Sequence, residues 1–177
     1  MILITGAGGF IGRNLATYLH ENGQPVLASG RREHDKFFKN QGIPYVKLDI
    51  AKKNDYLNIQ NNNIKKIVHL AAIVPTKKKI HSTSEYLSVN GCGILKLLDF
   101  CVKNKVTKFV NISSVSVYGM SGKNGVKENV ILKPFGIYAD YAIAKILAEL
   151  YTNRYVEDFN LSAITLRLGY VFGDSCA

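Results

Sequence analysis

Long apolar runs are missing from this sequence of 177 residues. Its longest apolar stretches, such as Ile67–Pro75, are interrupted by His69 and fall far short of the ~20 residues that a membrane-spanning helix requires. Met1 leads directly into the strand-like run Ile2–Ile4, which leaves no room for a secretory leader. These absences predict a cytoplasmic protein with no membrane partner.

Cysteine is scarce, and patterns typical of metal sites are missing. Cys92, Cys101 and Cys176 form no C-x-x-C pair, and no histidine cluster has the spacing of metal ligands. If Cys92 and Cys101 share one helix, as predicted below, nine residues at ~1.5 Å rise separate them by roughly 13 Å, too far for a disulfide. We therefore predict reduced thiols and no metal.

Acidic residues are few: 13 Asp and Glu stand against 23 Lys and Arg, for a net charge of +10. Such a charge suits nucleic acid, an anionic membrane surface or a phosphorylated small molecule. The lysines occur in short runs among asparagines, without an aromatic-studded basic stripe or a helix-turn-helix pattern. A solvated basic face is the preferred interpretation, and no nucleic-acid partner is predicted.

What the chain does contain is an alternation of strand-like and helix-like segments. Six runs are continuously apolar, as strands covered on both faces of a parallel sheet are; they are Ile2–Thr5, Val26–Ser29, Tyr45–Leu48, Lys66–Leu70, Lys108–Ile112 and Ser162–Leu168. Helical spacing is found at Phe10–Leu19, Tyr86–Val102 and Tyr141–Tyr155, the last with Ile143, Ile146, Leu147 and Leu150 on one side. Short connections imply right-handed βαβ crossovers. We predict one α/β domain over residues 1–177, with a doubly wound, mostly parallel sheet (a Rossmann fold).

A glycine-rich loop, Thr5-Gly6-Ala7-Gly8-Gly9-Phe10-Ile11-Gly12, joins the first strand to the first helix. Glycine is needed where φ is positive, where the backbone approaches a pyrophosphate and where the helix meets the strand. The helix N-terminus then offers N–H groups to the phosphates. Purely structural turns also contain such glycines, but the position between strand and helix favours a dinucleotide site that includes Gly6, Gly9, Phe10, Ile11 and Gly12.

The end of the second strand bears on which dinucleotide binds. Gly30 stands where an acidic residue would hydrogen-bond the adenosine ribose of NAD, and Arg31 and Arg32 follow it. Guanidinium groups bind a 2′-phosphate that a carboxylate would repel, so we prefer NADP over NAD as the cofactor. Alternatively, the two arginines belong to a solvated turn.

Further motifs extend over nearly the whole chain: Asp49-Ile50, His69-Leu70-Ala71-Ala72, Asn90 with Gly93, Ser113–Gly119, Tyr141-x-x-x-Lys145 and Glu149. With the glycine loop, their order and spacing resemble the extended short-chain dehydrogenase/reductases, specifically the NAD-dependent epimerase/dehydratase group. The resemblance implies that Asp49 and Ile50 contact the adenine, that Leu70, Ala71 and Ala72 line the path to the nicotinamide ribose, and that Asn90 belongs to the cofactor site. His69 is assigned no chemistry.

Tyr141 and Lys145 are four residues apart and so lie on one face of the predicted helix. A nearby ammonium can lower the pKa of a phenol from about 10 by ~1–3 units, which suits a general base. The resemblance implies that Tyr141 takes a proton from a substrate hydroxyl as hydride passes to the cofactor. It also implies that Lys145 holds the nicotinamide ribose and that Ser114 hydrogen-bonds the reacting oxygen.

The same region bears on the reaction type. The family's dehydratases carry Thr-Asp-Glu where this chain has Ser114-Val115-Ser116, and Val115 cannot transfer the proton that elimination of water requires. The resemblance therefore implies an NAD(P)-dependent nucleotide-sugar epimerase. NADPH-dependent reduction of a keto sugar or another small carbonyl is an alternative. A dinucleotide-sensing module without chemistry is another, although the intact Ser114, Tyr141 and Lys145 argue against it; a basic RNA-binding domain is a distant third.

Family members are considerably longer than this chain. We therefore expect an N-terminal portion that lacks most of the C-terminal substrate-binding part, binds a dinucleotide and turns substrate over poorly. The resemblance implies a nucleotide-sugar substrate and, in the full-length protein, a homodimer formed through the long helices near Cys92 and Tyr155. Two residues depart from the family pattern: Ala144 replaces a common serine, and Tyr170 replaces an asparagine that often touches the nucleotide.

Overall fold

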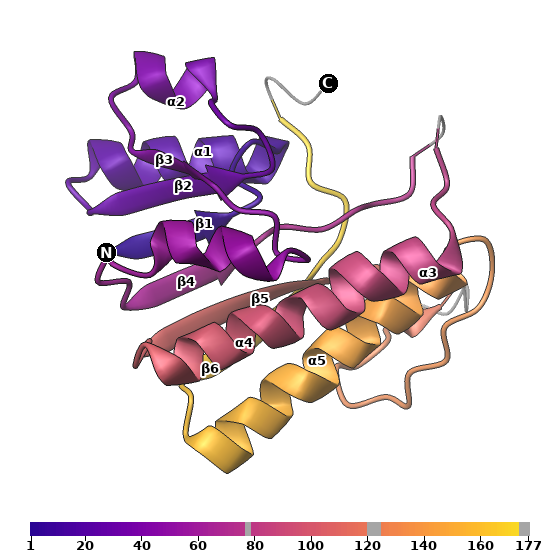
Figure 1. Ribbon diagram of the computed structural model, residues 1–177. Helices are drawn as coiled ribbons and strands as arrows, with labels where there is room; N and C mark the ends of the chain where they lie inside the picture. Colours follow the sequence, from indigo (N-terminus) through magenta and orange to yellow (C-terminus); the bar gives the residue numbers. More distant parts are fainter. Residues whose placement is uncertain (77–78, 120–124, 174–177) are drawn as a thin grey trace.

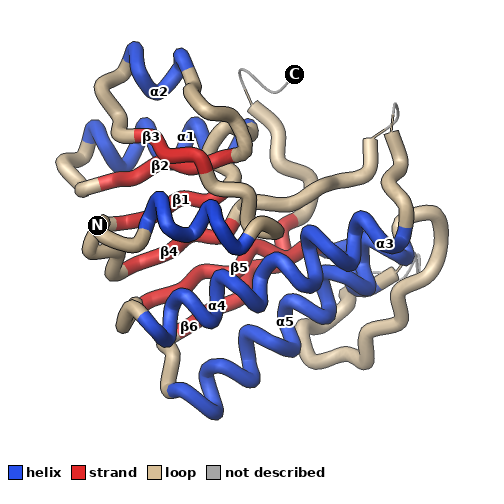
Figure 2. The backbone as a smooth tube through the Cα atoms, in the orientation of Figure 1, coloured by secondary structure: helices blue, strands red, loops and turns tan. Residues whose placement is uncertain are grey.

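Within residues 1–76, 79–119 and 125–173, which the computed structural model describes, six parallel strands form one sheet in the order β3-β2-β1-β4-β5-β6. The strands are β1 (Ile2–Thr5), β2 (Val26–Gly30), β3 (Tyr45–Lys47), β4 (Lys66–His69), β5 (Lys108–Ser114) and β6 (Ala163–Leu168). Helices cover both sides of the sheet (Figures 1 and 2). The predicted doubly wound α/β fold is confirmed.

The helical elements are α1 (Phe10–Glu21), α2 (Lys36–Asn40), α3 (Thr83–Tyr86), α4 (Gly93–Lys103) and α5 (Ala139–Phe159). Three shorter turns of other types complete them: η1 (Lys53–Ile59) and η3 (Val115–Tyr118) are 3-10 helices, and η2 (Leu87–Cys92) is a π-helical turn. None of the helices in the described ranges has the length and hydropathy needed to cross a bilayer.

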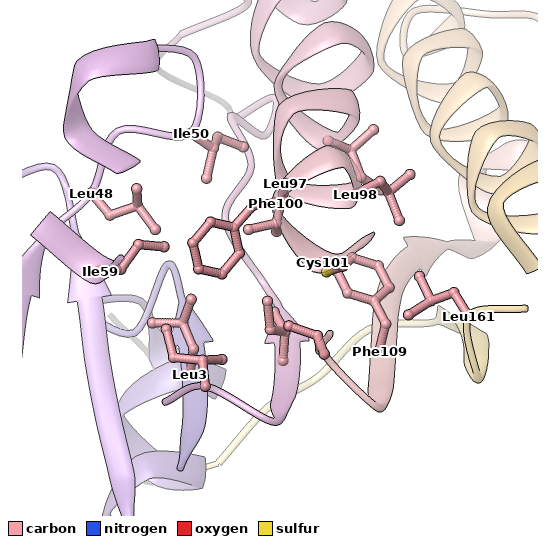
Figure 3. Packing of buried hydrophobic residues seen from close by; sticks show 14 of the residues in the cluster. Leu3, Leu48, Ile50, Ile59, Leu97, Leu98, Phe100, Cys101, Phe109 and Leu161 are labelled. Atoms are coloured by element: carbon pink, nitrogen blue, oxygen red, sulfur yellow. The ribbon is translucent and has the colours of Figure 1, made fainter. Parts of the chain in front are cut away.

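Side chains of the central strands alternate between two hydrophobic cores. Leu3 of β1 packs in one core with Leu97 of α4 and Phe109 of β5 (Figure 3). Its neighbour Ile4 lies in the other core, with Phe38 of α2. Burial on both faces explains why these strands read as continuous apolar runs.

Strand β6, at one edge of the sheet, is not fully covered by helices. β6 pairs with β5 on one side, and two of its apolar side chains, Ile164 and Leu166, are 55% and 40% exposed. We call these two residues the open β6 face. Contiguous exposed apolar surface of this kind is a candidate contact region.

The predicted helix at Tyr86–Val102 begins earlier, at α3, and runs through the π-helical turn into α4. Ser82 caps its start by accepting the N–H of Glu85, whose carboxylate in turn accepts the N–H of Ser82. Cys92 and Cys101 lie on this segment as free thiols, the first exposed and the second buried, as expected. Cys176 lies outside the described residues.

The apolar side of α5 noted in the sequence is not its buried face. Ile143 and Leu150 are 49% and 59% exposed. The buried face carries mainly small residues together with the polar site residues: Tyr141, Ala142, Ala144, Lys145, Ala148, Glu149 and Thr152. Small side chains allow this helix to pack closely, and its apolar side remains available for contact.

Candidate active site

A cavity of about 1030 Å³ opens at the carboxyl ends of the strands, where the strand order reverses between β1 and β4. Open α/β sheets bind ligands at such switch points. The cavity is lined by nearly all the predicted site residues, namely Gly6, Gly9, Phe10, Ile11, Gly12, Arg31, Arg32, Asp49, Ile50, Leu70, Ala71, Ala72, Ser114, Tyr141 and Lys145. Loops far apart in the sequence thus converge on one site.

The glycine loop leaves no space for side chains at two positions. Gly6 has a φ of 68°, and a Cβ there would lie 2.6 Å from the backbone nitrogen of Ala71. A Cβ at Gly12 would lie 2.6 Å from the Cα of Ala7. Gly9 is the N-cap of α1, and no side chain caps this helix end. The first N–H groups of α1 therefore remain available for an anionic group, as a dinucleotide pyrophosphate requires.

His69 joins the glycine loop to the loop after β4. Its Nδ1 is 2.8 Å from the hydroxyl of Thr5, which also accepts the N–H of Ala71 at 3.3 Å. Burial, with a smaller effect of the Lys145 charge, lowers the pKa of His69 to about 3. The imidazole is therefore neutral, in keeping with a structural role and no proton transfer.

Tyr141 and Lys145 are buried, one turn apart on α5, and both face the cavity. The ammonium of Lys145 donates to the carbonyl of Ile112 at 2.7 Å and lies 6.0 Å from the centre of the Tyr141 ring. Burial lowers the pKa of Lys145 to about 8, against an opposing effect of the Glu149 carboxylate. Lysine and tyrosine thus have the arrangement that their spacing predicts.

The pKa of Tyr141 differs from the sequence expectation. Burial raises it above 10, whereas the hydrogen bond with Ser114 lowers it, and the neighbouring Tyr86 adds a small increase. The direction is opposite to the lowering that the spacing of Tyr141 and Lys145 predicted. The ammonium of Lys145 donates to the backbone carbonyl of Ile112.

Ser114 ends β5 and begins the 3-10 turn η3. Its Oγ accepts the N–H of Ser116 at 3.2 Å and the hydroxyl of Ser116 at 2.9 Å. These bonds fix its rotamer beside Tyr141. Val115, at the position that decides between dehydratase and other chemistry, is 43% exposed.

Asn90, predicted to be a cofactor residue, is not among the described residues that line the cavity. Its buried amide accepts the N–H of Ile73 at 2.9 Å and donates to the carbonyl of Ile73 at 2.8 Å. Asn90 therefore holds the loop after β4 against the helix, and its influence on the cavity is indirect.

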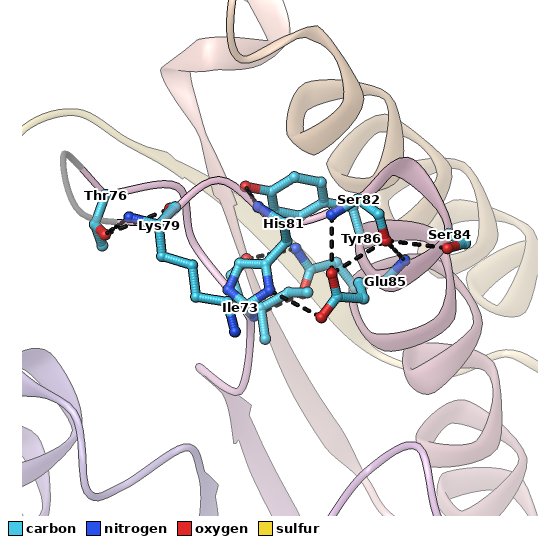
Figure 4. Close-up of polar contacts among 9 residues, drawn as sticks. Ile73, Thr76, Lys79, His81, Ser82, Ser84, Glu85 and Tyr86 are labelled. Carbon is cyan, nitrogen blue, oxygen red and sulfur yellow. Dashed lines mark hydrogen bonds and ion pairs between the residues drawn. The ribbon is translucent and has the colours of Figure 1, made fainter.

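Tyr86, which the sequence argument missed, supports Tyr141 from the segment shown in Figure 4. Its buried ring meets the ring of Tyr141 at a centroid distance of 5.8 Å and an interplanar angle of 66°. The Tyr86 hydroxyl accepts the N–H of His81 at 3.3 Å.

Glu85, whose carboxylate takes part in the cap of α3, lies next to Tyr86 in the sequence. Hydrogen bonds from the backbone of Ser82 and from the side chains of His81 and Ser82 lower its pKa to about 2, so the capping carboxylate is charged.

An ion pair between the buried Glu149 and the partly buried Arg167, also missed, ties β6 to α5. Arg167 donates to both carboxylate oxygens of Glu149, at 3.0 and 2.7 Å, and to the hydroxyl of Tyr118 at 2.9 Å. The hydroxyl of Ser113 also binds Glu149. Arg167 is the charged residue of an otherwise uncharged strand, and this was the available sequence signal for the pair.

Asp35 is a further unexpected residue of the cavity wall. It follows Arg31 and Arg32 in the loop after β2, is 6% exposed and caps α2 by accepting the N–H of Phe37 at 3.0 Å. The carboxylate of Asp35 thus lies near the glycine loop, whereas the end of β2, where NAD-binding proteins have an acidic residue, is occupied by Gly30.

Comparison with known proteins agrees with this geometry. The model of the NAD-dependent epimerase/dehydratase family matches residues 2–175. The chain belongs to this family.

Proteins similar to this epimerase/dehydratase family member include the UDP-glucose 4-epimerase of Mycolicibacterium smegmatis, 30% identical over 97% of this chain and 56% of that protein. Among solved structures, an epimerase of Methanothermobacter thermautotrophicus is 29% identical, with a TM-score of 0.83 over 97% of this chain and 52% of that one. The UDP-glucose 4-epimerase of Thermus thermophilus, in complex with NAD, is 26% identical, with a TM-score of 0.82 over 94% and 54%.

The chain spans about half the length of the curated relatives it matches. The resemblance deduced from the motifs is confirmed by the match to the epimerase/dehydratase family. The family is NAD-dependent by its description, and its solved relative from Thermus thermophilus holds NAD.

Proposed function

We propose that this chain binds NADP(H) in preference to NAD(H) and carries the hydride-transfer residues of a nucleotide-sugar epimerase. The observation that carries the proposal is that Ser114, Tyr141 and Lys145 line the same cavity as the glycine loop. The names of similar proteins, which include UDP-glucose 4-epimerases, support a nucleotide sugar as the substrate of the whole protein.

The residues of the cavity fit a dinucleotide. The uncapped start of α1 would hold the pyrophosphate, Asp49 and Ile50 the adenine, and the loop Leu70–Ala72 the path to the nicotinamide ribose. The cofactor, when bound, supplies the hydride acceptor and donor. At Gly6 and Gly12 the loop backbone packs directly against the backbone of Ala71 and Ala7, and no side chain of these two residues blocks a phosphate.

Tyr141 would take the proton from the reacting sugar hydroxyl, while Ser114 holds the oxygen. With a pKa of about 8, Lys145 is mainly protonated at neutral pH and can hold a ribose hydroxyl. Burial favours the neutral phenol, so Tyr141 needs positive charge at the site to act as a base. We assign Lys145 to provide part of that charge.

Val115 favours an epimerase over a dehydratase because elimination of water needs an acid or base at this place. Reduction of a keto sugar by NADPH uses the same three residues and is the alternative. We further propose that the full-length protein is a homodimer formed through α4 and α5, because Ile143 and Leu150 leave an apolar surface on α5 exposed.

Calorimetric titration of the chain with NADP and NAD tests cofactor binding. We expect both to bind and NADP to bind more tightly. Tighter binding of NAD would overturn the preference, and a lack of binding by either would overturn the proposed function.

The role of Tyr141 is tested with Tyr141→Phe. Stoichiometric protein, cofactor and UDP-sugar should give slow, measurable reduction of the cofactor at 340 nm, and this rate should fall by ~10²–10⁴-fold in the variant. Dinucleotide affinity should stay within about twofold, since the phenol is asked to move a proton and not to hold the cofactor. Tyr151→Phe, on the same helix, is the control. An unchanged rate in Tyr141→Phe would exclude it as the base, whereas cofactor binding without any reduction by the wild type would favour the sensing-module alternative.

A further inference from the structure

Two arginine side chains lie next to Asp35 of the cavity wall and make no side-chain hydrogen bond within the described residues; Arg32 lines the cavity itself, and Arg13 approaches Asp35 from α1. Arg32 follows β2, and Arg13 lies on the first turns of α1. Arg32 Nη1 is 3.6 Å and Arg13 Nη2 is 3.9 Å from Oδ2 of Asp35. Both separations exceed hydrogen-bond length, so the two contacts are electrostatic. In the described parts of the chain, the Nε of Arg13 is buried without any partner.

The guanidinium of Arg13 is nevertheless held in place. It lies over the ring of Phe37, 4.8 Å from the ring centre, in a cation–π contact. Phe37 is fixed in turn because its N–H is the one that Asp35 accepts at the start of α2. The cap and the first turn of this five-residue helix thus orient an arginine that comes from a different element.

The cluster lies beside the glycine loop. A Cβ at Gly8 would be 3.5 Å from Oδ2 of Asp35, and Gly8, Asp35, Arg31 and Arg32 all line the cavity. With the single carboxylate between them, Arg13 and Arg32 leave one net positive charge, and Arg31 adds a second. The side chains of Arg13 and Arg32 are 38% and 72% exposed. Guanidinium donors with excess positive charge that are open to solvent are suited to a phosphate group.

We propose that Arg13 is a specificity-determining residue that, together with Arg32, binds the 2′-phosphate of NADP(H). This inference rests on the proposed function and adds a residue that the sequence pattern at the end of β2 does not include. Arg13 contributes from α1, so the phosphate is held between two elements and not by the loop after β2 alone. Phe37 and Asp35 act as positioning residues through Arg13.

The affinities of three nucleotides distinguish specific recognition of a 2′-phosphate from non-specific attraction to a basic protein. Adenosine 2′,5′-bisphosphate carries the proposed recognition group, adenosine 3′,5′-bisphosphate has the same charge in another place, and 5′-AMP has no second phosphate. Calorimetry should show that the wild-type chain binds the 2′,5′ isomer about tenfold or more tightly than either of the others.

In Arg13→Gln the advantage of the 2′,5′ isomer should fall by about tenfold, with affinity for 5′-AMP and NAD unchanged within about twofold. Arg13→Lys keeps the charge without the planar fork and should lose part of the advantage. Phe37→Leu should weaken the 2′,5′ isomer alone, and Phe37→Tyr should restore it. Arg154→Gln, an exposed arginine paired with Asp158, is the control.

Each contrary outcome of these titrations overturns a different part of the proposal. Retention of the full 2′-phosphate advantage by Arg13→Gln, with a native circular dichroism spectrum, overturns the role of Arg13. Equal binding of the two bisphosphates by the wild type overturns the phosphate site but leaves dinucleotide binding intact. Absence of binding for NAD, NADP and 5′-AMP overturns the proposed function, and this inference with it.

Discussion

Lys145 is a buried cation, and its environment makes the stability of the fold depend on pH. Its pKa is about 8 when folded and that of an ordinary lysine, 10.5, when unfolded. Between these values the unfolded chain binds more protons, so the stability of the folded state rises with pH. Its titratable neighbours include His69, which is neutral throughout this range, Glu149 and Tyr141.

We expect the difference in unfolding free energy between wild type and Lys145→Met to shift in favour of the wild type from pH 7.5 to pH 10.5. The shift should be on the order of 3 kcal/mol, and most of it should occur above pH 8. Urea denaturation at several pH values measures it. Lys103→Met, at the exposed end of α4, should show no such trend, and a flat difference for Lys145→Met would contradict the assigned pKa.

Asn90 is a structural residue whose loss should be costly. Asn90→Ala leaves the N–H and carbonyl of Ile73 buried without their partners, which costs about 2–6 kcal/mol of stability at ~1–3 kcal/mol for each group. Urea denaturation should place Asn153→Ala, an exposed residue of α5, within about 0.5 kcal/mol of wild type. Equal stability of the two variants would show that the Ile73 contacts are dispensable.

The identity of single residues was the hardest thing to predict from the sequence. Tyr141 and Lys145 follow from a local spacing, and the glycine loop follows from its place after a strand. Asp35 and Tyr86 could not be found in this way, because each acts on a partner outside its own local motif. Asn90 was found from its motif and predicted as a cofactor residue, but its hydrogen bonds to Ile73 could not be predicted from the sequence.

The loop between β1 and α1 is the element that fixes the cofactor half of the cavity. Gly12→Ala pushes a methyl group to within 2.6 Å of the Cα of Ala7, and backbone atoms cannot yield easily. Overpacking of this kind costs typically ~1–3 kcal/mol. In Gly8→Ala the nearest atom is a side-chain oxygen at 3.5 Å, an ordinary contact.

We therefore expect thermal unfolding to show a clear loss of stability for Gly12→Ala and a change below about 1 kcal/mol for Gly8→Ala. Dinucleotide binding should be lost in the first variant, because the loop must open. Comparable melting temperatures for both would mean that the loop is less tightly packed than described.

Strands and long helices could be predicted because hydrophobic periodicity controls them. Strands β1 to β6 all lie where continuous apolar runs predicted them, with ends shifted by up to two residues. The short helix α2 and the turn η1 were not predicted. A five-residue helix has no full period to detect, and α2 depends on the cap formed by Asp35.

At the scale of the whole molecule, two of the exposed apolar surfaces within the described residues lie far apart in the sequence: one on α5, at Ile143 and Leu150, and one on the open β6 face. The proposed homodimer uses the first of these surfaces, on α5, for the contact between its two copies. We expect Leu150→Lys to reduce the apparent mass from dimer to monomer in analytical ultracentrifugation of the full-length protein.

Ile164→Lys, on the other surface, is the matched control because it introduces the same charge at a similarly exposed apolar site. It should leave the dimer intact. The reverse result, with Ile164→Lys dissociating the dimer and Leu150→Lys having no effect, would move the contact between copies from α5 to β6.

The pair formed by Arg167 and Glu149 gives this architecture a mechanical property. One partner belongs to strand β6 and the other lies a turn beyond Lys145, so strand and helix cannot slide independently without breaking a partly buried bidentate contact. A displacement of β6 would therefore be transmitted to the helix that contains Tyr141.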